Sequence, residues 1–192
     1  DRLNNEVEAA VREGVNIIVL SDRVPDGQVP VPSLLSLGSV HSHLIRRGLR
    51  MRGDIVVETG DAMTPHDYAC LVGYGASAIY PYLAHQLIRE MSADGRIKVD
   101  AKAGVENYNK ALTAGIVTIM SKMGISTMQG YHSAQIFEII GLAPEVVSGC
   151  FEGTPSPVGG LTMDDIQREC EGRYDEGEAQ RRSPSPDQLS SS

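Results

Sequence analysis

Three polar side chains lie where an α/β protein often places functional groups. Asp22 and Arg23 directly follow the apolar run NIIVLS (16–21), and Glu58 ends the run DIVVE (54–58). Loops at the carboxyl ends of parallel strands commonly carry catalytic groups, so position alone makes these residues site candidates. The opposing interpretation is structural, because a strand-end carboxylate often caps the next helix or pairs with an arginine.

Lys122 is a second candidate, in the stretch SKMGIST (121–127). A lysine in the last turn of a helix is stabilised by the helix macrodipole. A catalytic lysine needs burial and a lowered pKa, which no feature of the sequence indicates. We therefore interpret the stretch as a helix end, a turn at Gly124 and the start of a strand.

Polar groups follow this stretch between the expected strand and the next expected helix, at Gln129, Tyr131, His132 and Gln135. Ser133 is suited to cap that helix, whose N-terminus would then favour an anion or a carbonyl group. These spacings alone do not define a reaction.

Two other motifs favour structural interpretations. His41 and His43 stand two apart on an expected helix, so their side chains point about 200° apart and cannot share one metal ion; we expect one to face a neighbouring element and the other water. The segment GYGASA (73–78) precedes an expected strand, whereas the dinucleotide fingerprint follows one. Its glycines are therefore expected to end a helix and turn into a strand.

Composition excludes several classes of protein. Hydrophobic residues make up 41% and charged residues 22%, as in soluble globular proteins. The net charge of −8 argues against nucleic-acid binding, and no apolar run approaches the roughly 20 residues of a membrane span. Cys70, Cys150 and Cys170 are widely spaced, which argues against a zinc or iron–sulfur site and favours reduced, mostly buried thiols. The chain begins at Asp1 without a signal segment, which indicates a fragment or a processed chain.

Apolar runs and helical patterns alternate along most of the chain, which predicts an α/β fold of repeated β–α units with a mostly parallel sheet. Four units are too few for a complete eight-stranded barrel, so we expect part of an incomplete barrel-like or open α/β domain. From residue 171 the chain is rich in Ser, Pro and charge and is expected to be a disordered tail (171–192). The expected helices are 3–13, 34–48, 64–75, 81–91, 105–123 and 133–141, the expected strands are 16–23, 54–60, 76–81 and 124–129, and 92–104 is an expected surface insertion.

The order of several motifs resembles the large subunit of glutamate synthase from about Val15 to about Gln167. The motifs MSKMGIST (120–127) and AQIFEIIGL (134–142) are the most specific, and the others are GVNIIVLSDR, VPSLLSLGSVHSHLIRRGLR, VVETGDAMTPHDYACLVGYGASAIYPYLA and CFEGTPSPVGG. The helical spacing of residues 3–13 predicts a leading helix (1–14), and the resemblance implies that the C-terminal part of the family's central domain (15–170) follows it. Many relatives have Cys-Gly or Lys-Gly where this chain has His132 and Ser133, and many have Arg where it has Pro157.

The resemblance also implies a function for the whole protein. Glutamine and 2-oxoglutarate would yield two molecules of glutamate, with a reductant acting through an iron–sulfur cluster and FMN. This segment would be a scaffold that links the amidotransferase and FMN domains, with other domains of the same polypeptide, including a β-helix, as its partners. It would carry no catalytic, cofactor-binding or metal-binding residue, since the family's N-terminal nucleophilic Cys and its iron–sulfur motif have no counterpart here. An intracellular location, cytoplasmic or plastid, would follow.

The alternative is an independent α/β enzyme or ligand-binding module with a strand-end site formed by Asp22, Glu58 or Lys122. Such a module requires a complete sheet and a concave pocket with convergent polar groups.

Overall fold

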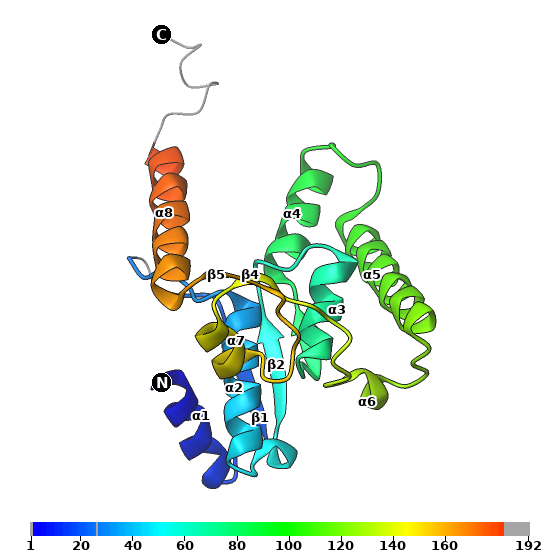
Figure 1. Cartoon of the computed structure of the whole chain (residues 1–192). Coiled ribbons are helices and arrows are strands. Elements are labelled where there is room, and N and C mark those ends of the chain that lie inside the picture. Colours follow the sequence, from blue (N-terminus) through cyan, green and yellow to red (C-terminus); the bar gives the residue numbers. More distant parts are fainter. Residues whose placement is uncertain (1, 26, 183–192) are drawn as a thin grey trace.

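A three-stranded parallel sheet forms the centre of the computed structural model, which describes residues 2–25 and 27–182 (Figure 1). A separate two-stranded parallel sheet pairs β4 with β5. The strands are β1 (Ile17–Ser21), β2 (Asp54–Glu58), β3 (Ala78–Tyr80), β4 (Ile140–Leu142) and β5 (Val158–Leu161). The helices are α1 (Arg2–Arg12), α2 (Ser33–Arg46), α3 (Pro65–Gly73), α4 (Tyr82–Ala93), α5 (Ala101–Met123), α6 (Met128–Tyr131), α7 (Pro144–Cys150) and α8 (Met163–Arg182), with a short 3₁₀ turn at Arg50–Arg52.

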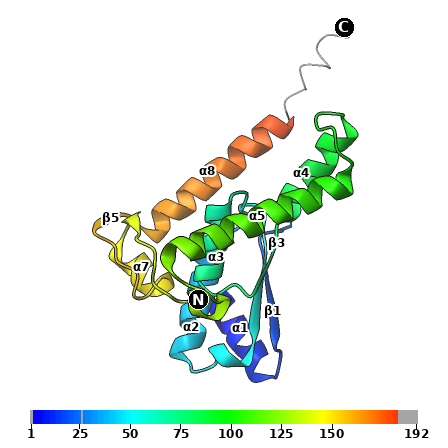
Figure 2. The same cartoon turned by 90° about the vertical axis from the view of Figure 1, so that its right-hand side faces the viewer.

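The strand order β1-β2-β3 distinguishes between the barrel-like and the open α/β sheet, both of which the sequence allowed. Each strand is added on the same side of the preceding one, and right-handed crossovers then place the connecting helices on one face. Figure 2 shows α2 and α3 on one side of β1, with no element over its other side. The α/β prediction is confirmed, and the arrangement is that of an incomplete barrel-like sheet rather than a doubly wound one.

Residues alternate between a covered and an open face of this sheet. On the covered face Ile18 and Leu20 of β1 and Ile55 and Val57 of β2 are buried against the helices, together with Leu37 of α2. The open face carries two rows across the strands, Val19–Val56–Ala78 and Ser21–Glu58–Tyr80. Several of its apolar side chains are exposed, because only one side of the sheet has helices packed against it.

Three segments differ from the sequence-based prediction. Residues 124–129 are not a strand. Gly124 ends α5 in the left-handed conformation. The Thr127 hydroxyl accepts from the backbone N–H of Gly130 and so caps the short helix α6 at its N-terminus. Threonine therefore acts here as a helix cap and not as a strand former. The helix expected at 133–141 is also absent, because Ser133 and Gln135 adopt positive φ and the chain continues into β4.

The tail prediction is wrong between 171 and 182. These residues continue α8 to Arg182, where the side-chain pairs Gln167–Glu171 and Arg173–Glu169 connect positions four apart in the sequence. Such pairs add a few tenths of a kcal/mol each to a polar helix. The rest of the expected tail, 183–192, lies outside the described residues.

Tyr131 supplies a stability prediction. Its side chain is fully buried, and its hydroxyl has no hydrogen-bond partner among the described residues. Because an unsatisfied buried hydroxyl costs about 1–3 kcal/mol, Tyr131→Phe should raise the free energy of unfolding by about 1 kcal/mol in urea titrations. Tyr68→Phe is the control: its hydroxyl lies 3.2 Å from that of Tyr108, so its loss should destabilise the chain. A destabilising Tyr131→Phe would contradict the expectation.

Candidate functional site

The carboxyl edge of the sheet brings Arg23 and Glu58 into direct contact. Glu58 pairs in register with Ser21, whose Oγ donates to Glu58 Oε2 at 2.6 Å. Arg23 Nε lies 3.1 Å from Glu58 Oε1, and the Arg23 guanidinium lies 3.9 Å from the centre of the Tyr82 ring at the start of α4. The charged groups of Arg23 and Glu58 are thus both in contact with other side chains of the same edge.

Asp22 connects three segments at the same edge. Its Oδ2 accepts from the backbone N–H of Gly60 at 2.6 Å, from Thr59 Oγ1 at 3.1 Å and from Ser33 Oγ at 3.3 Å. These bonds join the end of β1 to the loop after β2 and to the first residue of α2. Burial, followed by the Asp22 carboxylate, raises the pKa of Tyr82 to about 12. Asp22 therefore has a structural role, because one of its carboxylate oxygens accepts from donors in the loop after β2 and at the start of α2.

Lys122 does not join this cluster. It is exposed in the last turn of α5, and Gly124 ends that helix at φ +70°. The predicted helix end is confirmed at this position. The glycine interpretation of GYGASA is confirmed as well, because Gly73 is the last residue of α3 and Gly75 turns at φ +102° before β3 begins.

The opposite edge of the sheet contains a chain of three polar side chains. Arg50 Nε donates to His41 Nδ1 at 2.9 Å, and His41 Nε2 lies 3.0 Å from Ser133 Oγ. A guanidinium is always protonated and can only donate, so Nδ1 is the acceptor and the ring hydrogen is on Nε2. His41 therefore donates to Ser133. This tautomer is the reverse of the one that a general base needs to activate a serine, which excludes a Ser–His hydrolytic pair here.

The environment of His41 reinforces this assignment. Burial, the positive charge of Arg50 and the nearby His132 together lower the pKa of His41 to about 4. Burial and Arg50 also lower the pKa of His132. Both rings are consequently neutral near pH 7.

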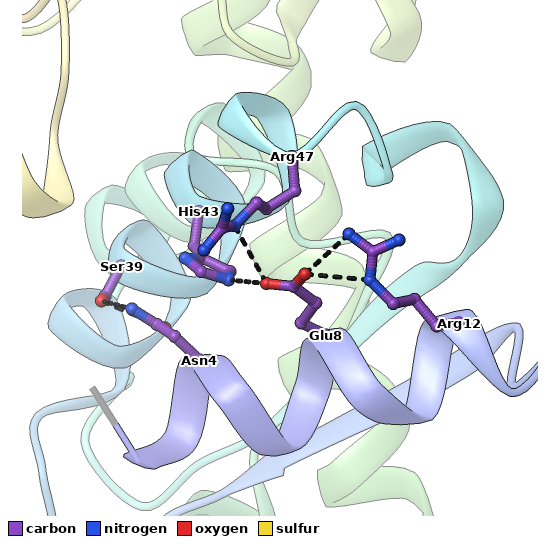
Figure 3. A network of polar contacts seen from close by, with 6 residues as sticks. All are labelled: Asn4, Glu8, Arg12, Ser39, His43 and Arg47. Carbon is purple, nitrogen blue, oxygen red and sulfur yellow. Dashed lines mark hydrogen bonds and ion pairs between the residues drawn. The ribbon is translucent and has the colours of Figure 1, made fainter.

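His43 leaves α2 on another side and contacts α1. Figure 3 shows its Nε2 on the Glu8 carboxylate, at 2.7 Å, with Arg47 and Arg12 on the same carboxylate. Hydrogen bonds from Arg12 and His43 lower the pKa of Glu8. Our expectation that one of the two histidines faces water is wrong, because α1 covers His43 while the Arg50 turn covers His41.

Three of the downstream polar residues, Gln129, His132 and Ser133, line one cavity. His132 and Ser133 lie at the amino edge beside His41, whereas the exposed Gln135 lies against Gly153, near enough to overlap an added Cβ there. Ser133 caps no helix, since the next helix along the chain, α7, begins only at Pro144. Gln129 lines the same cavity as Ser133, and Tyr131 is buried in a hydrophobic cluster with Ala69 and Val72.

Arg50 was missed by sequence reasoning, which ended the expected helix at Gly48 and gave residues 49–53 no role. Its Nη1 donates to the carbonyl of Gly53 at 2.7 Å and its Nη2 to that of Gly75 at 2.8 Å. A signal was present in RRGLRMRG, which concentrates four arginines (46, 47, 50 and 52) in a chain of net charge −8.

The cysteines do not fit an iron–sulfur cluster. Cys70, Cys150 and Cys170 are free thiols on α3, α7 and α8, and burial raises the pKa of each, to about 11 for Cys70. An iron–sulfur cage needs several thiolates around one cluster. In 2–25 and 27–182 no group of three or more His, Cys, Asp or Glu side chains is placed to hold a metal ion. Over the same residues no helix is long and apolar enough to cross a membrane.

Solved structures support the sheet type deduced from the strand order. A sulfite-bound double mutant of flavocytochrome b2 matches with a TM-score of 0.53 at 21% identity, over 86% of this chain and 38% of that one. The recombinant flavin-binding domain of baker's yeast flavocytochrome b2 matches with a TM-score of 0.51 at 18% identity, over 86% of this chain and 37% of that one. At these identities the likeness concerns the fold alone. The class is therefore a barrel-like β/α segment whose strand-end charges are paired internally.

Sequence comparison gives the family. The model of the glutamate synthase central domain matches residues 1–143. The glutamate synthase [NADPH] large chain of Bacillus subtilis (strain 168) is 42% identical over 172 residues, and the ferredoxin-dependent glutamate synthase of Pyropia yezoensis is 44% identical over 181 residues. The match spans 89% and 88% of this chain but only 11% and 12% of those relatives' lengths. This chain belongs to the glutamate synthase central-domain family.

Proposed function

We propose that this chain is a non-catalytic scaffold segment of a glutamate synthase. In that enzyme, glutamine and 2-oxoglutarate would give two glutamates with the help of a reductant. The segment would hold an amidotransferase domain and an FMN domain at a fixed separation, with a β-helix elsewhere on the polypeptide. A fixed, water-excluding separation favours transfer of a reactive intermediate between two sites.

The observation that carries the proposal is the pairing at the carboxyl edge of β1 and β2. A strand-end catalytic carboxylate needs an oxygen directed at a substrate, whereas Glu58 has one oxygen on Ser21 and the other on Arg23. Asp22 Oδ2 accepts from three donors of its own edge, and Asp22 Oδ1 is buried, without a hydrogen-bond partner among the described residues and closed to a substrate. The edge is better suited to fixing loops than to chemistry.

FMN and the iron–sulfur cluster are proposed to reside in other parts of the polypeptide. The separated thiols of this segment favour that placement for the cluster. Relatives include chloroplastic enzymes of Arabidopsis thaliana and a bacterial large chain. A cytoplasmic or plastid location, without nucleic-acid partners, remains our prediction for this chain.

Glu58→Gln provides the test, in a polypeptide that joins this segment to the rest of a glutamate synthase. The amide keeps the size of the side chain and an acceptor for Ser21 while it removes the charge. Because exposed ion pairs contribute about 0–1 kcal/mol, turnover with glutamine and 2-oxoglutarate should stay within about threefold of the unmodified enzyme.

The matched control is Arg23→Gln, which breaks the same pair from its other side. A catalytic Glu58 would give a loss of about a hundredfold or more in turnover with Glu58→Gln and little loss with Arg23→Gln, which would overturn the proposal. Binding of FMN or release of ammonia from glutamine by the 192-residue chain alone would also overturn it and favour the independent module.

A further inference from the structure

A large cavity lies at the amino edge of the sheet, on the side opposite to Asp22 and Glu58. It has a volume of about 1090 Å³ and is lined by residues at the starts of the strands, including Asn16 and Asp54, and by Arg50, His132 and Ser133. We call it the amino-edge cavity. The strand-end residues Asp22, Arg23 and Glu58 do not line it.

The floor of this cavity carries Arg50, whose guanidinium interacts at longer range with Asp54 of the same lining but forms no ion pair within 4.0 Å among the described residues. Arg50 is half-buried, and its three described hydrogen bonds go to neutral acceptors: an imidazole nitrogen and two backbone carbonyls. Over the described chain no carboxylate is within 4.0 Å of its guanidinium, and Asp54 instead accepts from Ser77 Oγ at 2.8 Å. A guanidinium has five N–H groups, so two remain for a ligand.

Ser133 adds a third donor to this floor. Because its Oγ accepts the hydrogen of His41 Nε2, its own hydroxyl hydrogen is free to point into the cavity. The backbone N–H of Ser133 donates to the carbonyl of Gly73 at 2.9 Å, which fixes the residue at φ +58°. Arg50 and Ser133 together offer donors suited to a carboxylate, whose two oxygens match the guanidinium fork.

Exposed apolar side chains line the amino-edge cavity beside the exposed charged residues Arg52 and Asp54. Met51 has 97% of its surface exposed and Ile17 has 61%, and the exposed side chains of Ile45 and Met128 also line the cavity. Met and Arg are enriched at the centres of protein–protein interfaces, whereas exposed apolar side chains are not required to bind a small ion. Ile17 also belongs to the open face of the sheet, so the two uncovered surfaces are continuous.

We infer that the amino-edge cavity docks another segment of the same polypeptide, which places an Asp or Glu carboxylate on Arg50 and Ser133 and covers Met51 with apolar side chains. The match to this chain spans only 11–12% of the relatives' lengths. The family therefore has enough additional chain to make this contact. The inference rests on the proposed scaffold function and specifies one contact that the scaffold would make.

Methionine oxidation tests the contact. Met51 should react rapidly with hydrogen peroxide in the 192-residue chain, and at least about tenfold more slowly in the complete polypeptide, as mass spectrometry of the Met51 peptide would measure. Equal rates in both states would overturn the inference. Protection of Met51 that grows with concentration in the 192-residue chain alone would also overturn it, because the occupant would then be a second copy.

Introducing either a negative or a positive charge at Met51 tests whether the docked segment carries a carboxylate. The side chain is almost fully exposed, so Met51→Glu and Met51→Lys should leave the thermal transition of the 192-residue chain unchanged. In the complete polypeptide Met51→Glu should speed amide exchange of residues 50–53 by about tenfold, whereas Met51→Lys should change it by less than about threefold. Equal effects, or a larger effect of Lys, would overturn the acidic occupant.

Val117 on α5 is a matched control, because it is exposed to 58% and does not line the cavity. Val117→Glu should leave exchange at 50–53 unchanged. These outcomes are independent of turnover in Glu58→Gln, so the scaffold proposal and the docking inference can fail separately.

Discussion

Replacing Gly75 with alanine should destabilise the chain by about 3 kcal/mol or more. Gly75 adopts φ +102°, which L-residues rarely adopt, and an added Cβ would overlap Nδ1 of His41. The ring must then move away from Arg50, whose Nη2 also bonds the carbonyl of Gly75. Urea denaturation followed by circular dichroism measures the change.

Two variants separate the causes of this effect. In a His41→Ala background the overlap is gone, so the additional cost of Gly75→Ala should fall to the backbone strain, about 1–2 kcal/mol. Gly149 lies in α7 with a helical backbone, and a Cβ added there would meet no other atom within 4 Å, so Gly149→Ala should stabilise by about 0.5–1 kcal/mol. A neutral Gly75→Ala would contradict the close contact with His41.

Acidification should destabilise the chain between about pH 6.5 and pH 4. The pKa of His41 is lowered from 6.5 to about 4, so in this window the unfolded chain binds a proton that the folded chain does not. Stability therefore falls as the pH falls, and the loss from this one group is on the order of 3 kcal/mol when pH 4 is reached. His132, whose pKa is also lowered, acts in the same direction.

His41→Asn isolates the contribution of this histidine. The asparagine Oδ1 can replace Nδ1 as the acceptor for Arg50, but the side chain does not titrate. The variant should lose most of the decline in stability between pH 6.5 and 4, as thermal denaturation in a pH series would show. An unchanged decline would mean that other groups cause it.

Local patterns were sufficient for most of the central elements. Apolar runs predicted β1, β2 and β3, and the Thr64–Pro65 start of α3 is a complete capping box with Asp67. The errors lie where tertiary contacts override local preference. The segment after α6 has helix-forming residues, but Ser133 and Gln135 turn at positive φ and Ile136 and Phe137 pack against the cluster around Tyr131.

The two edges of the sheet differed in how far sequence could predict them. Asp22, Arg23 and Glu58 directly follow or end strands, so their proximity follows from parallel pairing. The contact of Arg50, His41 and Ser133 joins residues up to 92 positions apart through loops of irregular conformation. No periodic pattern encodes such a contact, because it depends on the tertiary course of each loop.

The strand order has a consequence for biosynthesis. All three strands of the central sheet lie within residues 17–80 and pair with their sequence neighbours, so the sheet can form on the ribosome soon after this stretch emerges. At about 5–20 residues per second, residues 81–192 take on the order of ten seconds to follow. During that time the open face and the exposed side chain of Met51 are accessible, and we expect them to be the surfaces that a nascent-chain chaperone binds.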